Sequence, residues 1–520
     1  MTMLQVVSTA GVCLPVALMM MAMFLSRRQA TSTVALWRSF TMLSIVALVL
    51  TVLAALMPLD VQSLQPWLHP TPLGSGLAVL VQLLGTVIGA FSSRYLEGEH
   101  SQHRDIAALA GVLAAVHVLL LADHWAFLII AWAFVGVALQ NLLCFYPERP
   151  FALLAAYKKR IADRLADVLL ISAAALAWGE VGSGSFSALW AYLGREGIST
   201  ALHLSAVCLV LAVILRTALL PVHGWLIQVM EAPTPVSALL HAGVVNLGGF
   251  VLIRFAPLLE QATPARALLV AFGLCTAVLA GLVMLTRISI KVRLAWSTVA
   301  QMGFMVLECG VGLYTLAALH LIGHSLYKAH TFLSASTVVR ETRLQFMRGT
   351  TSPAPLSLFL APAAAMGVVA IIQSVIYPAA WPWWWSAVMG LAWAPLMWLS
   401  AQRTSFREIF LHAITGLLMI TGLTAAALLA HALPLGIHDV PNQTLGTVCL
   451  LGMAALYLWL IVLQLRPQSL NTWRRWSYAG FYVDEVYTRL ALRLWPGRWT
   501  PEAQKMDISP VPTIAADARQ

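Results

Sequence analysis

The sequence predicts an all-α polytopic membrane protein with about 13–15 transmembrane helices. Two observations carry this prediction. Of the 520 residues, 60% are hydrophobic and only 10% are charged, whereas soluble domains carry about 25% charged residues. The apolar residues also gather in runs of about 20, the length that a helix needs to cross the hydrocarbon core. A soluble enzyme, a nucleic-acid-binding domain and a disordered chain are therefore excluded.

The apolar runs give fifteen candidate spans along the chain. They are residues 4–25, 34–57, 73–91, 106–122, 124–145, 162–179, 201–220, 236–256, 265–285, 293–309, 314–338, 356–377, 383–400, 408–431 and 445–464. The loops between them are too short for a soluble domain of about 100 residues. We expect one transmembrane domain over residues 1–464, followed by a cytoplasmic or interfacial tail over residues 465–520.

The net charge of +10 arises from arginines and lysines in alternate loops. These residues are Arg27, Arg28, Arg38, Arg94, Arg104, Arg149, Lys158, Lys159, Arg160, Arg287, Lys291, Arg293, Arg340, Arg343, Arg348, Arg403 and Arg407. The intervening loops hold only Arg195, Arg254 and Arg266. Because cytoplasmic loops are enriched in basic residues, we expect the N-terminus outside and the C-terminus in the cytoplasm.

Aromatic and basic residues suggest how the ends of the spans are anchored. Trp473-Arg474-Arg475-Trp476 is typical of an interfacial anchor. Residues 478–494 after it predict an amphipathic helix on the membrane or against a partner. Trp381, Trp383, Trp384 and Trp385 are expected at the outer interface.

The first polar group inside the apolar runs covers residues 216–241. Pro221 and Gly224 interrupt one helix, and Pro233 and Pro235 follow. A helix break in a membrane is tolerated where it lines a hydrated cavity, as in ion transporters. Arg216 is then expected near the midplane. The alternative is a kinked packing helix with a snorkelling arginine.

The second polar group lies on one predicted helix. His320, His324 and Lys328 are spaced four residues apart, so they share a helix face. Imidazoles titrate near neutrality and a buried lysine can lose its proton, so the ladder could relay protons through water. Metal or haem ligation and inert packing are the alternatives.

The third polar group is Asp163, Arg164 and Asp167, at the start of the span 162–179. An ion pair at the mouth of a pathway and solvated charges at a helix end are both consistent with it. Lys291 lies near another cytoplasmic helix end, where orientation alone explains it.

The sequence lacks the motifs for nucleotide binding, for nucleophilic catalysis and for metal binding by cysteines. No phosphate-binding loop, dinucleotide fingerprint or nucleophile elbow is found, and the six cysteines form no CxxC or Cys/His cluster. We expect no catalytic residue, cofactor or metal in this chain. Ion movement would then be driven by a gradient or by a partner.

Three motifs resemble the antiporter-like subunits of respiratory complex I (NuoL, or subunit 5) and of Mrp cation/proton antiporters. They are EAPTPVSALLH at 231–241, IKVRLAWSTVAQMG at 290–303 and H-x-x-x-H-x-x-x-K-A at 320–329. The resemblance implies two inverted five-helix repeats with discontinuous helices, near residues 106–256 and 265–400. It also implies a proton relay through His241, a central axis at His320, His324 and Lys328, and a charged pair at Arg164 and Asp167.

The chain departs from that family at three points. The family's buried glutamate is replaced by Ala133, after Trp132, and its partner lysine by Arg216. An arginine effectively cannot lose its proton, so Arg216 is either a fixed charge or a sign that the first half-channel conducts differently. The tail is also too short for the long lateral helix of subunit 5.

This shortened form, with GFYVDEVY at 480–487, is similar to the membrane subunits (DabB) of Dab inorganic carbon accumulation complexes. The resemblance implies a bacterial inner-membrane location and a cytoplasmic zinc-binding partner of the DabA type, related to β-carbonic anhydrases. Cation flow, expected to be H+, would cross a continuous wet path through this chain and drive hydration of CO2 in the partner. The alternatives are a pumping subunit of a complex I-like respiratory or hydrogenase-linked complex, a stand-alone Na+/H+ antiporter, and a passive anchor.

Overall fold

The protein is a bundle of long helices. The computed structural model describes residues 3–494, apart from residues 29–31, 58–65, 147, 335–351, 379, 402–404, 467 and 469. The first half contains α1 (Met3–Leu25), α2 (Thr33–Leu56), α3 (Pro72–Tyr95), α4 (Gln102–Leu121), α5 (Trp125–Leu143), α6 (Pro150–Val181), α7 (Phe186–Glu196) and α8 (Thr200–Arg216). Then come α9 (Gly224–Gln228), η2 (Val229–Glu231), α10 (Thr234–Ala242), η3 (Val244–Asn246), α11 (Leu247–Arg254) and α12 (Ala256–Gln261).

The second half continues with long helices and ends in two short ones. It contains α13 (Thr263–Leu285), α14 (Ile290–Val311), α15 (Tyr314–Leu333), α17 (Pro355–Ile376), α18 (Trp383–Trp393), η4 (Ala394–Met397), α19 (Phe406–His431) and α20 (Gln443–Leu465). The tail forms α21 (Asn471–Tyr478), η5 (Gly480–Tyr482) and α22 (Val483–Leu494). No strand occurs in the described ranges, so the all-α prediction is confirmed there.

Each of the fifteen predicted spans overlaps at least one helix. Within the described residues, ten helical segments are long and apolar enough to cross a membrane. The other five predicted spans fall on helices outside those ten. They are residues 4–25 on α1, 162–179 on α6, 201–220 on α8, 314–338 on α15 and 383–400 on α18. The count of 13–15 spans therefore stays a prediction. Parts of three predictions lie outside the described residues. They are residues 335–338 of the span 314–338, the basic-loop residues Arg340, Arg343, Arg348 and Arg403, and the tail beyond Leu494.

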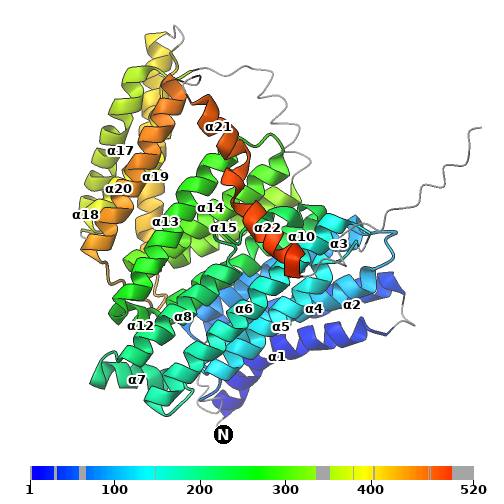
Figure 1. The fold of residues 1–520 in the computed structure, drawn as a ribbon. Coiled ribbons are helices and arrows are strands. Elements are labelled where there is room, and N and C mark those ends of the chain that lie inside the picture. The colour runs from blue at the N-terminus through cyan, green and yellow to red at the C-terminus, as the bar shows by residue number, and fades with distance from the viewer. Residues whose placement is uncertain are drawn as a thin grey trace, which may run out of the picture.

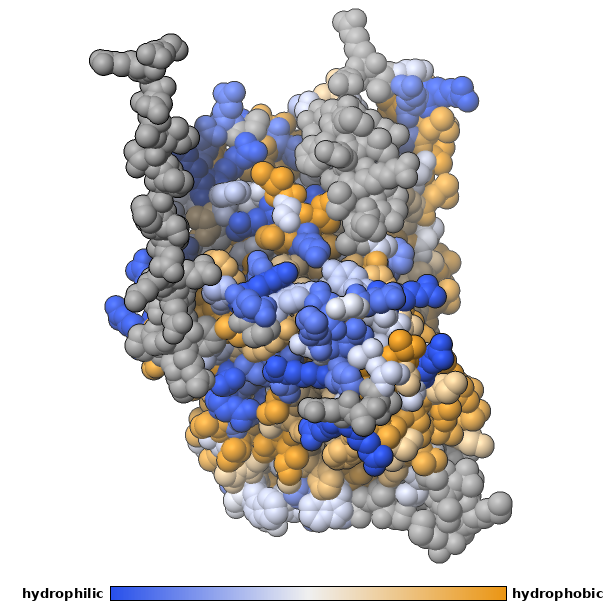
Figure 2. Space-filling view, turned by 90° about the vertical axis from the view of Figure 1, so that its right-hand side faces the viewer, coloured by the Kyte–Doolittle hydropathy of each residue, from blue (hydrophilic) through white to orange (hydrophobic). Residues whose placement is uncertain are grey.

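Large apolar side chains cover the outside of the bundle, as lipid contact requires. Leu418 of α19, Leu451 of α20 and Ile130 of α5 are each about two-thirds exposed. On the face at the right of Figure 1, hydrophilic residues gather across the middle and hydrophobic residues lie below them (Figure 2). The protein is a multi-pass membrane protein.

The helices pack in two groups joined by α13, α14 and α15. In Figure 1, α1–α6 form the lower right of the bundle and α17–α20 the upper left. α6 packs on α8, α13 on α14, and α10 on α15, so the interrupted helices lie within the bundle. The predicted inverted repeats and the predicted orientation of the termini stay predictions.

The helix predicted to break at Pro221 and Gly224 does break there. α8 ends at Arg216, and residues 217–223 are non-helical before α9 begins at Gly224. Pro233 and Pro235 lie at the start of α10, where a missing amide proton is no loss. A second break was not predicted, because residues 236–256 were taken as one span. There Gly243 ends α10 and a 3₁₀ turn leads into α11.

Lys158 and Lys159 are not loop residues, which corrects one assignment from the sequence. α6 begins at Pro150, so both lysines lie two turns inside a 32-residue helix, and both are buried. A hydropathy window ends a span at the first charges, although Lys and Arg are good helix formers. Asp163 is therefore a buried mid-helix residue, not a helix-end charge.

One aromatic prediction also changes. Trp381, Trp384 and Trp385 are buried inside the bundle, and of these four tryptophans only Trp383 is largely exposed. In the tail, the half-buried Trp473 ring packs 4.8 Å from that of Trp459, whereas Trp476 is exposed, and the interfacial anchor stays a prediction. The amphipathic helix of the tail forms as α22 and crosses the bundle near α6 and α10 in Figure 1.

Candidate ion-conducting axis

Four charged residues form a cluster between α6 and α8, called here the α6–α8 cluster: Lys159, Asp163, Asp167 and Arg216. Lys159 pairs with Asp163 one turn along α6. Arg216 pairs with Asp167 across to α8. All four are buried. Charges buried in a membrane helix bundle are unfavourable unless they are paired, and they commonly mark ion pathways.

Arg216 is held from three directions. Besides Asp167, it donates to the carbonyl oxygen of Trp132 at 2.7 Å and lies 4.8 Å from the centre of that ring. Arg164, on the outer side of the cluster, lies 3.0 Å from Asp167 and is more than half exposed. These directional contacts hold the Arg216 guanidinium, which stays charged, in one position; its role as a fixed charge stays a prediction. Ala133 provides no carboxylate beside it.

A second lysine on α6 is bound by the tail. Lys158 is fully buried, and its Nζ lies 2.6 Å from Asp484 of α22 and 2.9 Å from the Thr488 hydroxyl. Tyr487 donates to the carbonyl oxygen of Lys158. Gly224, at the break before α9, leaves the space that Asp484 and Lys158 occupy. No local sequence pattern indicates this pairing, because Lys158 and Asp484 are 326 residues apart.

The central axis consists of His241 on α10 and His320, His324 and Lys328 on α15. The predicted ladder is present: the rings of His320 and His324 lie 6.1 Å apart on one face of α15. The ring of His241 stacks 4.7 Å from Phe332, one turn beyond Lys328. The described residues offer no hydrogen bond to either ring nitrogen of His241 or of His324. The two rings therefore keep free sites for protons or water.

Lys328 is fully buried, and among the described residues it has only neutral acceptors. Its Nζ donates to the carbonyl oxygen of Leu294 at 2.9 Å and to the hydroxyl of Ser297 at 2.8 Å. Both belong to the IKVRLAWST motif at the start of α14. A buried ammonium without a carboxylate is unfavourable, and a lysine, unlike an arginine, can release its proton in such a place.

The second break lies beside this axis. Asn246 donates to the carbonyl oxygen of Ala242 at 3.0 Å, satisfying one acceptor that the break frees, and to Ser325 of α15 at 2.7 Å. Lys291 is farther out: its Nζ donates to Thr234, at the start of α10, at 3.2 Å. It is half-buried and lies beside the predicted break residues Pro233 and Pro235, not on the ladder.

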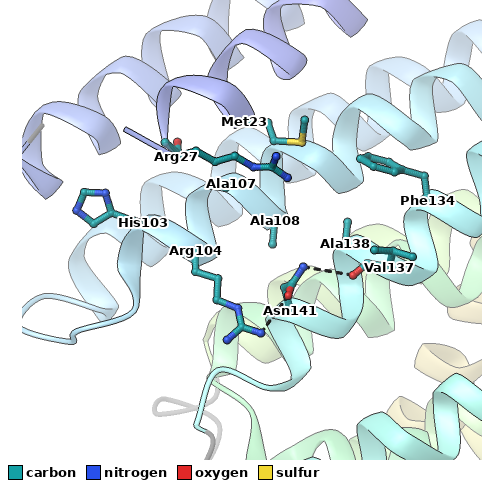
Figure 3. A pocket seen from close by; sticks show the side chains of 11 residues that line it. Met23, Arg27, His103, Arg104, Ala107, Ala108, Phe134, Val137, Ala138 and Asn141 are labelled. Carbon is teal, nitrogen blue, oxygen red and sulfur yellow. Dashed lines mark hydrogen bonds between the residues drawn. The ribbon is translucent and has the colours of Figure 1, made fainter. Parts of the chain in front are cut away.

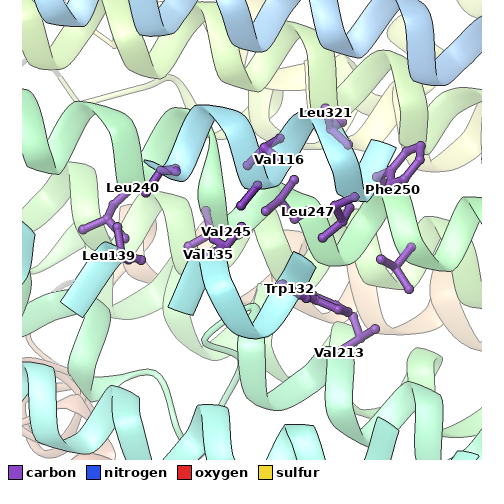
Figure 4. Packing of buried hydrophobic residues seen from close by; sticks show 14 of the residues in the cluster. Val116, Trp132, Val135, Leu139, Val213, Leu240, Val245, Leu247, Phe250 and Leu321 are labelled. Carbon is purple, nitrogen blue, oxygen red and sulfur yellow. The ribbon is translucent and has the colours of Figure 1, made fainter. Parts of the chain in front are cut away.

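Five buried apolar side chains of one packed cluster are called here the apolar layer: Trp132, Val135, Leu139, Leu240 and Val245 (Figure 4). The carbonyl oxygen of Trp132 accepts from Arg216, and Leu240 precedes His241 in the chain. No hydrogen bond or ion pair between described residues joins Arg216 to His241 or Lys328. The continuous wet path expected from the sequence stays a prediction.

Glu308 is a buried charged residue that was not among the site residues expected from the sequence. This residue lies in the predicted span 293–309, is buried, and its Oε2 is 2.8 Å from Nδ1 of His320. A carboxylate inside an apolar run was a sufficient signal to include it.

One cavity of the protein lies apart from the central axis. A cavity of about 330 Å³ lies between α1, α4 and α5, with Arg27 and Arg104 at its edge and Ala108 and Phe134 deeper in (Figure 3). Arg104 donates to Asn141 at 3.0 Å there. None of the central-axis residues lines this cavity.

No group of three or more His, Cys, Asp or Glu residues with metal-binding geometry occurs in the part of the chain that the structure describes. The metal alternative for His320 and His324 therefore has no third ligand among these residues.

Comparison with known proteins identifies the family. The model of the family described as NADH:quinone oxidoreductase/Mrp antiporter, TM matches residues 122–351. The probable inorganic carbon transporter subunit DabB2 of Halothiobacillus neapolitanus is 38% identical over 445 residues, which are 81% of this chain and 79% of the relative. The DabB of Hydrogenovibrio crunogenus is 35% identical over 446 residues, 83% of this chain and 84% of the relative. This chain belongs to the DabB family.

Among solved structures, the Mrp complex from Dietzia sp. DQ12-45-1b matches with a TM-score of 0.60 and 22% identity. The match covers 94% of this chain and 61% of that chain. At this identity it supports the antiporter-like fold alone. The resemblance drawn from the three motifs is confirmed, and residues 122–351 include the α6–α8 cluster and the whole central axis.

Proposed function

We propose that this DabB-family chain is the cation-conducting membrane subunit of an inorganic carbon transporter in the bacterial inner membrane. The cation is proposed to be H+. Its flow would drive hydration of CO2 to bicarbonate in a cytoplasmic zinc-binding partner of the DabA type, related to β-carbonic anhydrases. The chain itself would carry no catalytic residue.

The observation that carries this proposal is Lys328. It is fully buried, has only neutral acceptors in the part of the chain that the structure describes, and lies on one helix face with two histidines. A packing lysine would be expected to have a carboxylate partner, as Lys158 and Lys159 have. An amine that takes up and releases a proton needs neutral acceptors and neighbouring imidazoles, and α14 and α15 supply both.

We infer that the apolar layer separates the α6–α8 cluster from the central axis and ties flow to the partner. A dry layer blocks protons, because they move along chains of water and polar groups. Conduction would therefore require a rearrangement that hydrates the layer. The tail helix α22, bound to Lys158 beside the break at Gly224, is an element through which a cytoplasmic partner could act on that region.

The test is purification in mild detergent followed by metal analysis. We expect a soluble partner to copurify, with zinc present in the complex and absent from the isolated chain. Flavin or iron–sulfur partners would favour the complex I-like alternative. Cation/proton exchange in vesicles by the chain alone would favour a stand-alone antiporter.

A further inference from the structure

Glu308 brings a buried carboxylate to the end of the central axis. It lies one turn before the end of α14, with 5% of its side chain exposed. Its only ionic partner among the described residues is His320, at 2.8 Å. The Phe304 ring covers His320 at 5.9 Å, on the α14 side. The carboxylate therefore extends the ladder of His320, His324 and Lys328 by one step.

The loop between α19 and α20 lies over the turn that follows Glu308 at the end of α14. Asp439 of that loop accepts from the backbone amide of Thr315 at 2.8 Å. Its second oxygen lies 3.9 Å from Nε2 of His431. Burial raises the pKa of the Asp439 carboxyl above its usual range, against the opposing effects of the Thr315 amide and His431. The loop is fixed over the α14–α15 turn, because the amide of Val440 donates to the carbonyl of Gly312 at 3.0 Å.

We propose that Glu308 and His320 form the proton-binding site through which the central axis exchanges protons with the side of the membrane that carries the α19–α20 loop. This rests on the proposed function, since it assigns an entry site to the same axis. Among the described residues, Cys309 on α14 and Cys449 on α20 interact electrostatically with Glu308, and Asp439 in the loop interacts with Cys309. The buried Arg266 of α13 adds a positive charge at the same turn, because it donates to the carbonyl oxygens of Gly310 and Val440, each at 3.0 Å, and Tyr314 lies beside it. His324 is the next group along α15.

The proton balance of the pair is simple. With one proton, the pair is a carboxylate and an imidazolium with no net charge, which a buried site tolerates. Transfer of that proton towards His324, through a water because the ring centres are 6.1 Å apart, leaves one net negative charge. That charge attracts the next proton from the loop side. His324 has both ring nitrogens free among the described residues, so one can accept while the other donates.

The alternative is that Glu308 and His320 form an ion pair with a purely structural role. A neutral isostere of Glu308 distinguishes this alternative from proton binding. Glu308→Gln keeps an oxygen that can accept from His320 but cannot take part in proton binding. Glu180→Gln is the matched control, because Glu180 accepts a hydrogen bond from the Tyr192 hydroxyl at 3.2 Å and has no hydrogen bond or ion pair with an axis residue among the described residues.

The experiment measures proton flux in liposomes containing the complex of this chain with its copurified partner. A potassium gradient with valinomycin sets the potential, and a trapped pH dye reports the flux. We expect Glu308→Gln and His320→Asn to reduce flux by about tenfold or more, with thermal midpoints close to that of the unmodified complex. Glu180→Gln is expected to conduct normally.

Lys328→Ala in the same liposomes distinguishes a failure of the Glu308 assignment from a failure of the proposed function. If Lys328→Ala is blocked while Glu308→Gln conducts normally, the assignment of Glu308 is wrong and the proposed function stands. If the unmodified complex does not conduct, or Lys328→Ala conducts normally, the proposed function itself fails.

A second variant keeps the site testable if Glu308→Gln does not fold. Glu308→Asp retains the carboxylate but moves it away from His320. We expect it to conduct with an altered pH profile of the flux. A flux and pH profile identical to those of the unmodified complex would contradict the assignment.

Discussion

Lys158 on α6 and Asp484 on α22 form an ion pair of 2.6 Å that fastens the C-terminal tail to the membrane bundle. The lysine is fully buried and the aspartate is about one-third exposed. The pair lies against Gly224, where the broken helix resumes. The tail is thus in direct contact with the discontinuous part of the fold.

Removal of the aspartate should weaken the bundle. Loss of one partner from a buried ion pair costs about 3–5 kcal/mol. Because Asp484 is partly exposed, water reduces the effect, and we expect Asp484→Ala to cost about 1–3 kcal/mol. The thermal midpoint of the purified protein in detergent measures this loss. A midpoint equal to that of the unmodified protein would show that the pair does not hold the tail.

Gly224→Ala should disturb the same contact. A Cβ at this position would collide with the Asp484 carboxylate, so the tail must shift. We expect a lower thermal midpoint, and little further loss when Asp484→Ala is added, because both changes act on one contact. Gly281→Ala is the matched control, since a Cβ there meets no atom within 4 Å. Full additivity of the two changes would argue against a shared contact.

Arg216 is predicted to be irreplaceable even by lysine. Its guanidinium reaches Asp167 and the Trp132 carbonyl at the same time and lies over the Trp132 ring. A single ammonium cannot reproduce that geometry. We expect proton flux by the reconstituted complex to be severely reduced in Arg216→Ala and clearly reduced in Arg216→Lys. Full activity of Arg216→Lys would weaken the fixed-charge role while leaving the pathway in place.

The apolar layer should act as a barrier to leakage. Leu139 is fully buried in it. Leu139→Asn places an amide of similar size there, and a buried polar group without partners attracts water. We expect faster passive proton entry into liposomes, whereas Leu139→Met, which stays apolar, leaves the rate unchanged. An unchanged rate in Leu139→Asn would place the barrier elsewhere.

The sequence predicted most of the elements because the bilayer imposes a strict rule on them. Backbone groups in lipid must be paired within the element, so apolar runs of sufficient length become helices. Pro221 and Gly224 predicted one break, because a proline and a glycine interrupt the backbone pairing of a helix. The break at Gly243–Asn246 was missed, because Asn246 and its partner Ser325 repair it through a tertiary contact that no local pattern reveals.

The candidate site was only partly predictable. The i, i+4 spacing of His320, His324 and Lys328 placed them on one face, as found. The pairing of Lys158 with Asp484 depends on how the tail folds back, and local spacing does not reveal it. The apolar layer was also invisible, because its residues look like any other core.

The most direct test of the central claim, that this axis conducts protons for a bound partner, is Lys328→Ala in the reconstituted complex. We predict that proton flux and bicarbonate accumulation both fall to background, while assembly with the partner and the thermal midpoint are retained. Arg407→Ala, which removes an exposed cation at the start of α19, should behave normally. Normal flux and normal bicarbonate accumulation in Lys328→Ala would contradict the account.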